Sequence, residues 1–208
     1  MFTLYARPGS GSAAVEAVLA ACDVAYQLVD IPRSGKGFED YLAVNPRGEV
    51  PSLRLPDHSL MTESAAMVIY LSDSFPAAGL APAMNSHLRA QYLRWILYFA
   101  SSVYMANLRF YYPARHSVEV GAADGIKAKA IADLNRDFTI FANGLGQGPY
   151  VLGEVFSAAD IYAAMLVSWA PDMKALFAKH TNIKRHYELV AVRPKILPIW
   201  KRNDMLVA

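Results

Sequence analysis

The chain reads Asn45-Pro46-Arg47-Gly48-Glu49-Val50-Pro51 just before an apolar stretch that has the pattern of a β-strand. Pro51 stands at the first residue of that strand, where a residue without a backbone N–H is tolerated. If the Val50–Pro51 peptide bond is cis, the N–H and C=O of Val50 turn outward and can pair with an extended peptide. If it is trans, as most X–Pro bonds are, Pro51 is an ordinary proline of an edge strand. This segment alone leaves both interpretations open.

The residues on the N-terminal side of this segment predict a strand, a helix and a second strand. Phe2–Ala6 is a short apolar run, and the turn after it contains Pro and Gly. Ser12 has the position of a helix N-cap. Behind it, apolar side chains recur at helical spacing: Val15, Val18, Leu19 and Cys22. With a second strand at Tyr26–Ile31, this order predicts a parallel pair joined by a right-handed crossover.

The residues on the C-terminal side predict a hairpin between two helices. We expect a short helix at residues 38–44, then strands at 50–55 and 59–61 that a tight turn connects. Thr62 can cap a following helix that runs from Glu63 to about Ser74. The predicted order is therefore βαβ, a short helix, and ββα.

The composition changes after this helix. Residues 76–85 contain two prolines and a glycine and resemble a linker, and no convincing strand follows. Ser157 and Asp160 form a pattern close to a capping box at the start of a strongly apolar helix. We therefore predict an α/β domain at residues 1–75 and an all-helical domain at residues 86–208.

The composition limits the partners of the chain. Of its 208 residues, 54% are hydrophobic and 18% are charged, which is typical of a folded protein. The 20 basic and 18 acidic residues are scattered, so we expect no nucleic-acid partner. The single cysteine, Cys22, excludes a disulfide within the chain and suits a reducing compartment. We see no signal peptide, no apolar run long enough to span a membrane and no metal-binding histidine spacing, and we expect a cytoplasmic protein.

The start of the predicted helix after Thr62 is a candidate site for an amino-acid head group. The exposed amides of a helix N-terminus attract a carboxylate, and the Ser64 hydroxyl can add a hydrogen bond. Glu63 can accept a hydrogen bond from a ligand ammonium group. The alternative is that these residues only cap the helix.

The turn Gly9-Ser10-Gly11-Ser12-Ala13-Ala14 has three interpretations. It matches a dinucleotide fingerprint, with Asp30 near the end of the next strand, but the hairpin that follows leaves the sheet too small for that fold. A hydroxyl of Ser10 or Ser12 at the helix N-terminus can instead hydrogen-bond a ligand thiolate and lower its pKa. In the third interpretation Ser12 only caps the helix and Ser10 only fills the turn.

Four segments in this order resemble the glutathione S-transferase family over nearly the whole chain. They are the Pro-Gly-Ser-Gly-Ser turn from Pro8, Asn-Pro-Arg-Gly-Glu-Val-Pro-Ser-Leu from Asn45, Thr-Glu-Ser-Ala-Ala from Thr62, and Phe-Ser-Ala-Ala-Asp-Ile from Phe156. The resemblance implies a thioredoxin-like N-terminal domain that holds glutathione, followed by an all-α domain. It also implies a cytosolic homodimer.

The resemblance also implies roles for individual residues. Pro51 would be a cis proline, and Val50 would pair its backbone with the cysteinyl part of glutathione. Glu63 and Ser64 would hold the γ-glutamyl head. The sulfur would face one of two serines, Ser10 or Ser12. The pair at the start of the apolar helix, Ser157 and Asp160, would be structural.

The chain departs from the family pattern at two places. Several bacterial members have a cysteine where Gly11 stands here, and others use a tyrosine, for which Tyr5 is the nearest candidate; we expect strand alternation to bury it. These features favour a serine-type site. Glu49 replaces a lysine or glutamine that often touches the glycine carboxylate of glutathione, and it would repel that group. Arg33 or Lys36 would compensate from the loop after the second strand.

The resulting hypothesis is a glutathione S-transferase, in which the glutathione thiolate attacks an electrophilic carbon of an apolar molecule. Tyr104, Arg109 and Tyr112, which gather at one helix end with Tyr111, either line the apolar pocket or pack in the core or a subunit interface. Two alternatives stay open: a glutathione-binding or interaction module without transferase activity, and a dinucleotide-binding protein.

Overall fold

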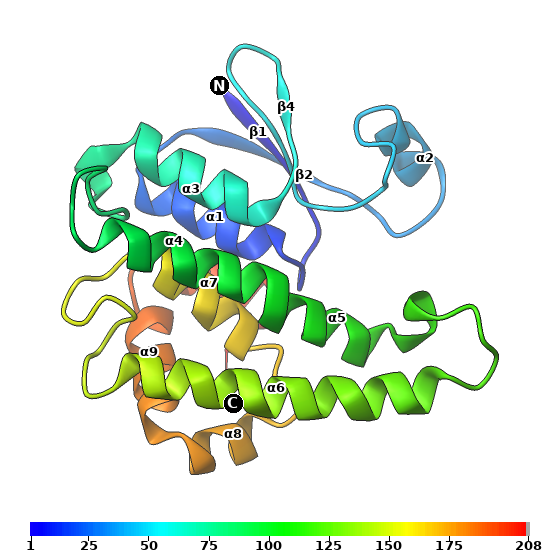
Figure 1. Ribbon diagram of the computed structural model, residues 1–208. Helices are drawn as coiled ribbons and strands as arrows, with labels where there is room; N and C mark the ends of the chain where they lie inside the picture. The colour runs from blue at the N-terminus through cyan, green and yellow to red at the C-terminus, as the bar shows by residue number, and fades with distance from the viewer. Residues whose placement is uncertain (207–208) are drawn as a thin grey trace. The chain divides into compact units, whose positions relative to one another are not determined.

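The computed structural model describes residues 1–206, and Figure 1 shows their helices and strands. The chain forms two compact units. One contains Met1–Ala81 together with the described residues from Ala191 onward, and the other contains Pro82–Val190. The sequence predicts an all-helical domain from residue 86 onward, whereas the last helix, α10 (Leu197–Arg202), belongs to the N-terminal unit. The role of residues 76–85 as a linker stays a prediction.

The N-terminal unit is built on a four-stranded sheet with the order β2-β1-β3-β4. Its strands are β1 (Phe2–Ala6), β2 (Tyr26–Asp30), β3 (Ser52–Arg54) and β4 (Leu60–Met61). β1 and β2 are parallel, and β3 and β4 form an antiparallel hairpin, as the sequence predicted. β3 also pairs antiparallel with β1. The described residues contain only this one parallel pair, so the further βαβ units of a dinucleotide-binding fold are missing from them.

Alternation along β1 directs one face of the sheet to the core. Three of its side chains are buried: Phe2, Leu4 and Ala6. Helices α1 (Ser12–Ala21) and α3 (Ser64–Ser74) contact each other and lie side by side along the sheet in Figure 1. The unit also contains α2 (Lys36–Leu42), a 3-10 turn at Pro76–Ala78, and α10 (Leu197–Arg202).

The second unit consists of helices. They are α4 (Arg89–Tyr98), a π-helical turn (Phe99–Tyr104), α5 (Met105–Tyr111), a 3-10 turn (Pro113–His116), α6 (Ala123–Leu145), α7 (Ala158–Val167), α8 (Met173–Lys179) and α9 (Thr181–Ala191). No helix among residues 1–206 has both the length and the apolar character to cross a membrane.

An aromatic cluster forms the core where α4 meets α6. Trp95 stacks on Phe99 with 5.3 Å between ring centroids, and Phe141 meets the Phe99 ring edge-on at 5.1 Å. Five side chains of this stretch are buried: Tyr92, Trp95, Ile96, Phe99 and Val103. The last two belong to the π-helical turn, which follows α4 directly.

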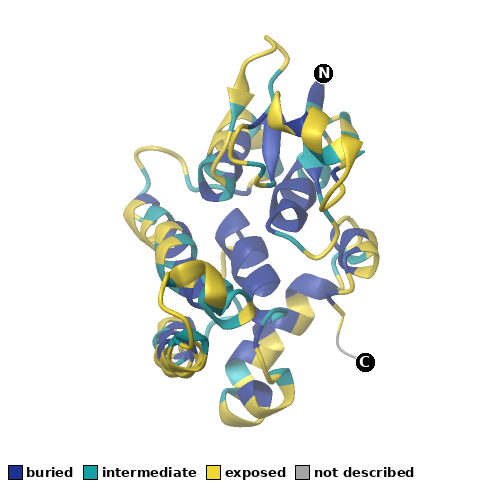
Figure 2. Cartoon of the chain, turned by 90° about the vertical axis from the view of Figure 1, so that its right-hand side faces the viewer, coloured by how far each residue is buried: buried dark blue, intermediate teal, exposed yellow. Residues whose placement is uncertain are grey.

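Helix α7 is buried at all ten of its residues, and Figure 2 draws buried positions in dark blue. Ser157 and Asp160 form the capping box that the sequence predicted at its start. The Asp160 carboxylate also accepts hydrogen bonds from the Val151 amide at 2.8 Å and from Nε2 of His186 at 3.0 Å. Because Asp160 and His186 are both fully buried, this network fixes the start of α7 to the preceding loop and to α9.

Candidate functional site

The Val50–Pro51 peptide bond is cis, as the family resemblance implied. Three buried polar side chains support the backbone around it: Tyr41, Asn45 and Ser52. The Tyr41 hydroxyl donates to the carbonyl of Glu49 at 2.7 Å, and the Asn45 amide donates to the same carbonyl at 2.8 Å. Both side chains also contact Ser52 Oγ.

This scaffold leaves the backbone of Val50 available. Val50 is half-buried, and no hydrogen bond to its N–H or C=O is formed within residues 1–206. Since its neighbour Glu49 is held through the carbonyl, the position of the Val50 backbone is well defined. An extended ligand can therefore add its own backbone here in the manner of an extra strand.

Helix α3 begins at Ser64, after the β3–β4 hairpin that follows Pro51, and its N-cap is Glu63. The prediction that Thr62 caps the helix is therefore wrong by one residue. Glu63 has φ 67°, which is uncommon for a residue with a side chain, and such backbone strain clusters at functional sites. The side chain of Glu63 is exposed, and that of Ser64 is half-buried.

The turn before α1 brings both candidate serines onto one carbonyl. Ser10 Oγ donates to the Arg7 carbonyl at 2.6 Å and lies 2.9 Å from Ser12 Oγ, which is itself 3.1 Å from that carbonyl. The two hydroxyl groups have only two protons, so at most two of these three oxygen–oxygen contacts are hydrogen bonds at any one time. Ser10 can turn its proton towards a ligand while Ser12 keeps the bond to Arg7.

The two serines differ in exposure and position. Ser12 is fully buried, and it is the first residue of α1, with Gly11 as the N-cap. The prediction that Ser12 is the N-cap is therefore wrong, because its hydroxyl is engaged with the backbone of Arg7. Ser10 is half-buried. Of the two hydroxyls, that of Ser10 is the accessible one.

Tyr5 does not lie in the core, so the expectation that strand alternation buries it is wrong. Alternation places it on the face of β1 opposite Leu4, where it is half-buried. Its ring packs on Tyr41 with 5.6 Å between centroids, and its hydroxyl accepts a hydrogen bond from Arg54 at 3.3 Å.

The charge of Glu49 is compensated from within its own turn. Arg47 forms two hydrogen bonds to the Glu49 carboxylate, at 2.8 and 3.0 Å. The hydrogen bond and charge of Glu49, with a smaller effect of the Glu63 charge, raise the pKa of Arg47. Lys36 pairs with Asp40. A role for Arg33 or Lys36 in binding the glycine carboxylate of glutathione stays a prediction. The sequence does carry a signal for the Arg47–Glu49 pair, which is the two opposite charges on either side of Gly48.

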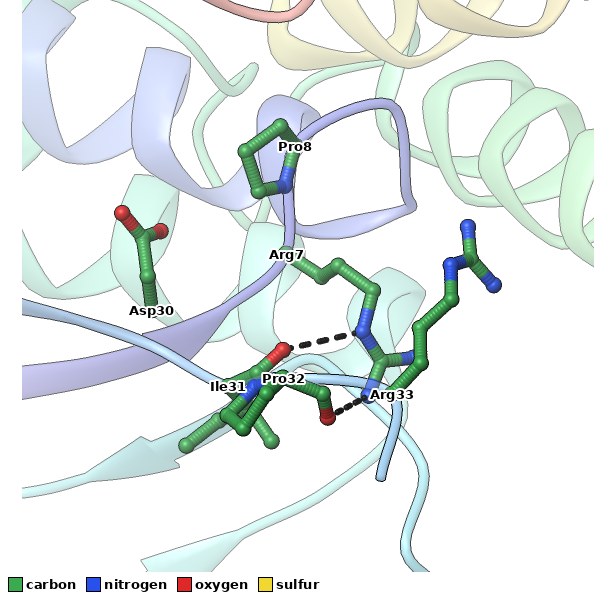
Figure 3. Close-up of a pocket in the computed structure, with 6 residues that line it drawn as sticks. All are labelled: Arg7, Pro8, Asp30, Ile31, Pro32 and Arg33. Atoms are coloured by element: carbon green, nitrogen blue, oxygen red, sulfur yellow. Dashed lines mark hydrogen bonds between the residues drawn. The ribbon is translucent and has the colours of Figure 1, made fainter. Parts of the chain in front are cut away.

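A pocket of about 380 Å³ lies where β1 and β2 end. Figure 3 shows the Arg7 guanidinium bound to the carbonyls of Ile31 and Pro32, both at 3.0 Å. Arg33 and Arg7 reach into the same side of this pocket, and Asp30 lies on the other side. Arg33 forms no ion pair within the described part of the chain.

The three residues predicted to line a substrate pocket each have contacts within the helical unit. Tyr104 packs edge-on against Trp169 at 5.2 Å, Arg109 lies 3.6 Å from the Asp133 carboxylate, and Arg115 covers the Tyr112 ring at 4.3 Å. Their role in a substrate pocket stays a prediction. Among residues 1–206, no group of three or more His, Cys, Asp or Glu is arranged to hold a metal ion.

Two family models match the chain. "Glutathione S-transferase, N-terminal domain" matches residues 4–79, and "Glutathione S-transferase, C-terminal domain" matches residues 103–194. The chain belongs to the glutathione S-transferase family. This confirms the predicted family, the thioredoxin-like domain followed by a helical one, and the enzyme class of glutathione transferase.

Individual members of the glutathione S-transferase family match over nearly the full chain. The uncharacterized GST-like protein YncG of Escherichia coli K12 is 29% identical, over 99% of this chain and 100% of its own length. Glutathione S-transferase GstA of Escherichia coli O157:H7 is 28% identical, over 93% of this chain and 94% of its own. A glutathione transferase homologue from Sulfitobacter, solved with bound glutathione, is 29% identical with a TM-score of 0.87, over 99% of both chains.

Proposed function

We propose that this glutathione transferase binds glutathione along the Val50–Pro51 segment and that the glutathione thiolate attacks an electrophilic carbon of an apolar molecule. The attack forms a carbon–sulfur bond, and the displaced electron pair leaves with a leaving group or moves into a polarised double bond. The observation that carries the proposal is the backbone of Val50, which has no hydrogen-bond partner within residues 1–206 and follows the firmly held carbonyl of Glu49. The Sulfitobacter relative with bound glutathione supports the choice of ligand.

The γ-glutamyl end of glutathione is assigned to the start of α3. The amides of the first turn point out of the helix and favour a carboxylate, and no acidic residue lies in that turn. Ser64 adds a hydroxyl, and the exposed carboxylate of Glu63 can accept from the ligand ammonium group. The left-handed backbone of Glu63 is the second feature that marks this helix start as a binding site.

The sulfur of glutathione is assigned to Ser10. A hydrogen bond from its hydroxyl favours the thiolate over the thiol and lowers the thiol pKa. Ser12, which is buried, keeps the Arg7 carbonyl satisfied when Ser10 turns to the sulfur. A free cysteine thiol has a pKa of about 8.5, so a decrease of about two units makes thiolate the main form at pH 7.

The glycyl carboxylate of glutathione is assigned to Arg33. Lys36 is paired with Asp40, and Arg47 is paired with Glu49. Arg33 lines the pocket at the ends of β1 and β2 and has no such partner within the described chain. Of the two compensating residues predicted from sequence, Arg33 is therefore the stronger candidate and Lys36 the weaker.

The electrophile is proposed to be an apolar small molecule, with Tyr104, Arg109 and Tyr112 of the helical unit in its pocket. The aromatic contacts around Tyr104 suit an apolar ligand. A homodimer and a cytoplasmic location are proposed on the basis of the family. The alternative of a binding module without transferase activity rested on Glu49 and on the missing cysteine and tyrosine. It loses the first of these grounds, because Arg47 neutralises the Glu49 charge.

The test of this proposal is isothermal titration calorimetry with glutathione, for the wild type and for Ser64→Ala. We expect micromolar to millimolar binding that is about tenfold weaker in the variant, because a hydrogen bond to a charged group is lost. Ser101→Ala is the matched control, since this exposed serine only donates to the Leu97 carbonyl of its own helix. Binding of equal strength in Ser64→Ala and wild type would contradict the assigned position of the γ-glutamyl group.

A further inference from the structure

The C-terminal segment of the N-terminal unit is tied to α1 by three polar contacts. Lys195 forms an ion pair with Asp23, just after the end of α1, and Arg202 forms one with the buried Glu16 within it. Asn203 then accepts a hydrogen bond from the backbone N–H of Gly9 at 3.0 Å, just before α1. The start of the segment thus contacts the C-terminal end of α1, and its end contacts the turn before α1. The segment therefore runs antiparallel to α1.

The side chain of Asn203 has a fixed orientation. It is 3% exposed, and its Nδ2 donates to the Ile199 carbonyl of α10 at 2.8 Å. Since the amide nitrogen is used by α10, the amide oxygen must face Gly9. Asn203 therefore presents an acceptor, and not a donor, to the turn before α1.

The turn that Asn203 meets has the features of a type II β-turn. Ser10 N donates to the Arg7 carbonyl at 3.2 Å, Pro8 is the second residue, and Gly9 is the third with φ 69°. In such a turn the N–H of the third residue belongs to the central peptide and is not used by the turn itself. A flip of that peptide converts type II to type I and changes φ of Gly9 to a negative value. The hydrogen bond from Gly9 to Asn203 opposes this flip.

We propose that Asn203 is a positioning residue for the turn that carries Ser10. By holding the Pro8–Gly9 peptide in its type II orientation, it keeps the hydroxyl of Ser10 where the sulfur of glutathione is bound. The proposal rests on the role given to Ser10 in the proposed function. Asn203, which is 194 residues from Gly9 in the sequence, thereby contributes to the ionisation of the glutathione thiol.

The experiment compares Asn203→Ala with the wild type by the pH dependence of thiolate absorbance in the glutathione complex. We expect the pKa of the bound thiol to rise by about one unit, which lowers the thiolate fraction at pH 6 about tenfold. Lys195→Gln is the matched control, because it removes another contact of the same segment at the far end of α1. Its thiol pKa should equal that of the wild type. An unchanged thiol pKa in Asn203→Ala that still binds glutathione would overturn the proposal.

A second measurement needs only the wild type and covers the case in which Asn203→Ala does not fold. The Gly9 amide should exchange its hydrogen at least about a hundredfold more slowly than an unprotected amide, because opening the segment is required first. Exchange at the unprotected rate would show that Asn203 does not hold the turn. If the wild type does not bind glutathione, the proposed function is wrong. Slow exchange at Gly9 would still show that Asn203 keeps the turn in its type II conformation.

Discussion

Arg47 and Glu49 face each other across Gly48, with Nε to Oε2 at 2.8 Å and Nη2 to Oε1 at 3.0 Å. Gly48 allows this arrangement with φ 64°, and a Cβ there would come within 2.7 Å of the Phe38 ring. Glu49 is therefore part of a neutral pair at the edge of the proposed glutathione site. The repulsion expected from its sequence position is cancelled by its neighbour.

Removing Arg47 should expose that repulsion. We expect Arg47→Gln to weaken glutathione binding about fivefold at low ionic strength, and less at 0.15 M salt because exposed charges are screened. The double variant Arg47→Gln, Glu49→Gln should bind as the wild type does. Titration calorimetry of the three proteins checks this, and a single variant as tight as the wild type would show that Glu49 lies away from the ligand.

The approach of α6 to Trp95 predicts a strong effect of one methyl group. A Cβ at Gly144 would lie 2.1 Å from the Trp95 indole, in the stacked aromatic core. Gly144→Ala should therefore lower the free energy of unfolding by about 1–3 kcal/mol through overpacking. Gly125→Ala in the same helix, where nothing lies within 4 Å, should raise it by about 0.5–1 kcal/mol. Denaturant unfolding of both variants measures this, and equal effects would contradict the packing described for α6.

The buried carboxylate of Asp160 predicts a second stability effect. Asp160→Asn replaces one of the two acceptor oxygens with an NH2 group, which is a donor. In one orientation this NH2 group faces the N–H of Ser157, and in the other it faces the donors of Val151 and His186. We expect a loss of about 3 kcal/mol in the free energy of unfolding. Asp172→Asn, at the exposed N-cap of α8, should cost about 0.5 kcal/mol or less. Thermal unfolding compares the two, and similar melting temperatures would show that the Asp160 network is not a stabilising one.

Cys22 should be slow to react in the folded protein. Burial, with the charge of Asp23, raises its pKa to about 11. A raised thiol pKa keeps the thiol protonated at pH 8, so alkylation by iodoacetamide should be about two orders of magnitude slower than for a free cysteine. The rate should rise with pH up to that pKa and should reach the free value after unfolding in guanidinium. A rate equal to that of free cysteine at pH 8 would contradict the burial of Cys22.

The sequence predicted the parts of the fold that depend on local pattern. The parallel pair was predicted from the apolar runs at Phe2–Ala6 and Tyr26–Ile31, and the β3–β4 hairpin from the tight turn between its two strands. The pairing of β1 with β3 was not predicted, because it joins segments that are distant in the sequence. The capping box of Ser157 and Asp160 was visible because both partners lie within four residues. The cis isomer of Pro51 could be stated only through the family, because the local sequence permits either isomer.

The features that the sequence did not predict depend on contacts between distant residues or on side-chain geometry. Ser12 was expected to cap α1, but its hydroxyl binds the backbone of Arg7. Helix α10 was assigned to the helical domain, and the contacts of Arg202 and Asn203 with residues near α1 had no signal in the sequence. The pairing of Arg47 with Glu49 was visible as two opposite charges, but only the turn at Gly48 makes it geometrically possible.

The most direct test is the ionisation of the glutathione thiol on the protein, followed by thiolate absorbance against pH for the wild type and for Ser10→Ala. A free thiol has a pKa of about 8.5, and the proposed function predicts a pKa about two units lower for the bound thiol of the wild type. In Ser10→Ala the pKa of the bound thiol should rise again by at least about one unit. A bound thiol that titrates like free glutathione in both proteins would contradict the proposed function.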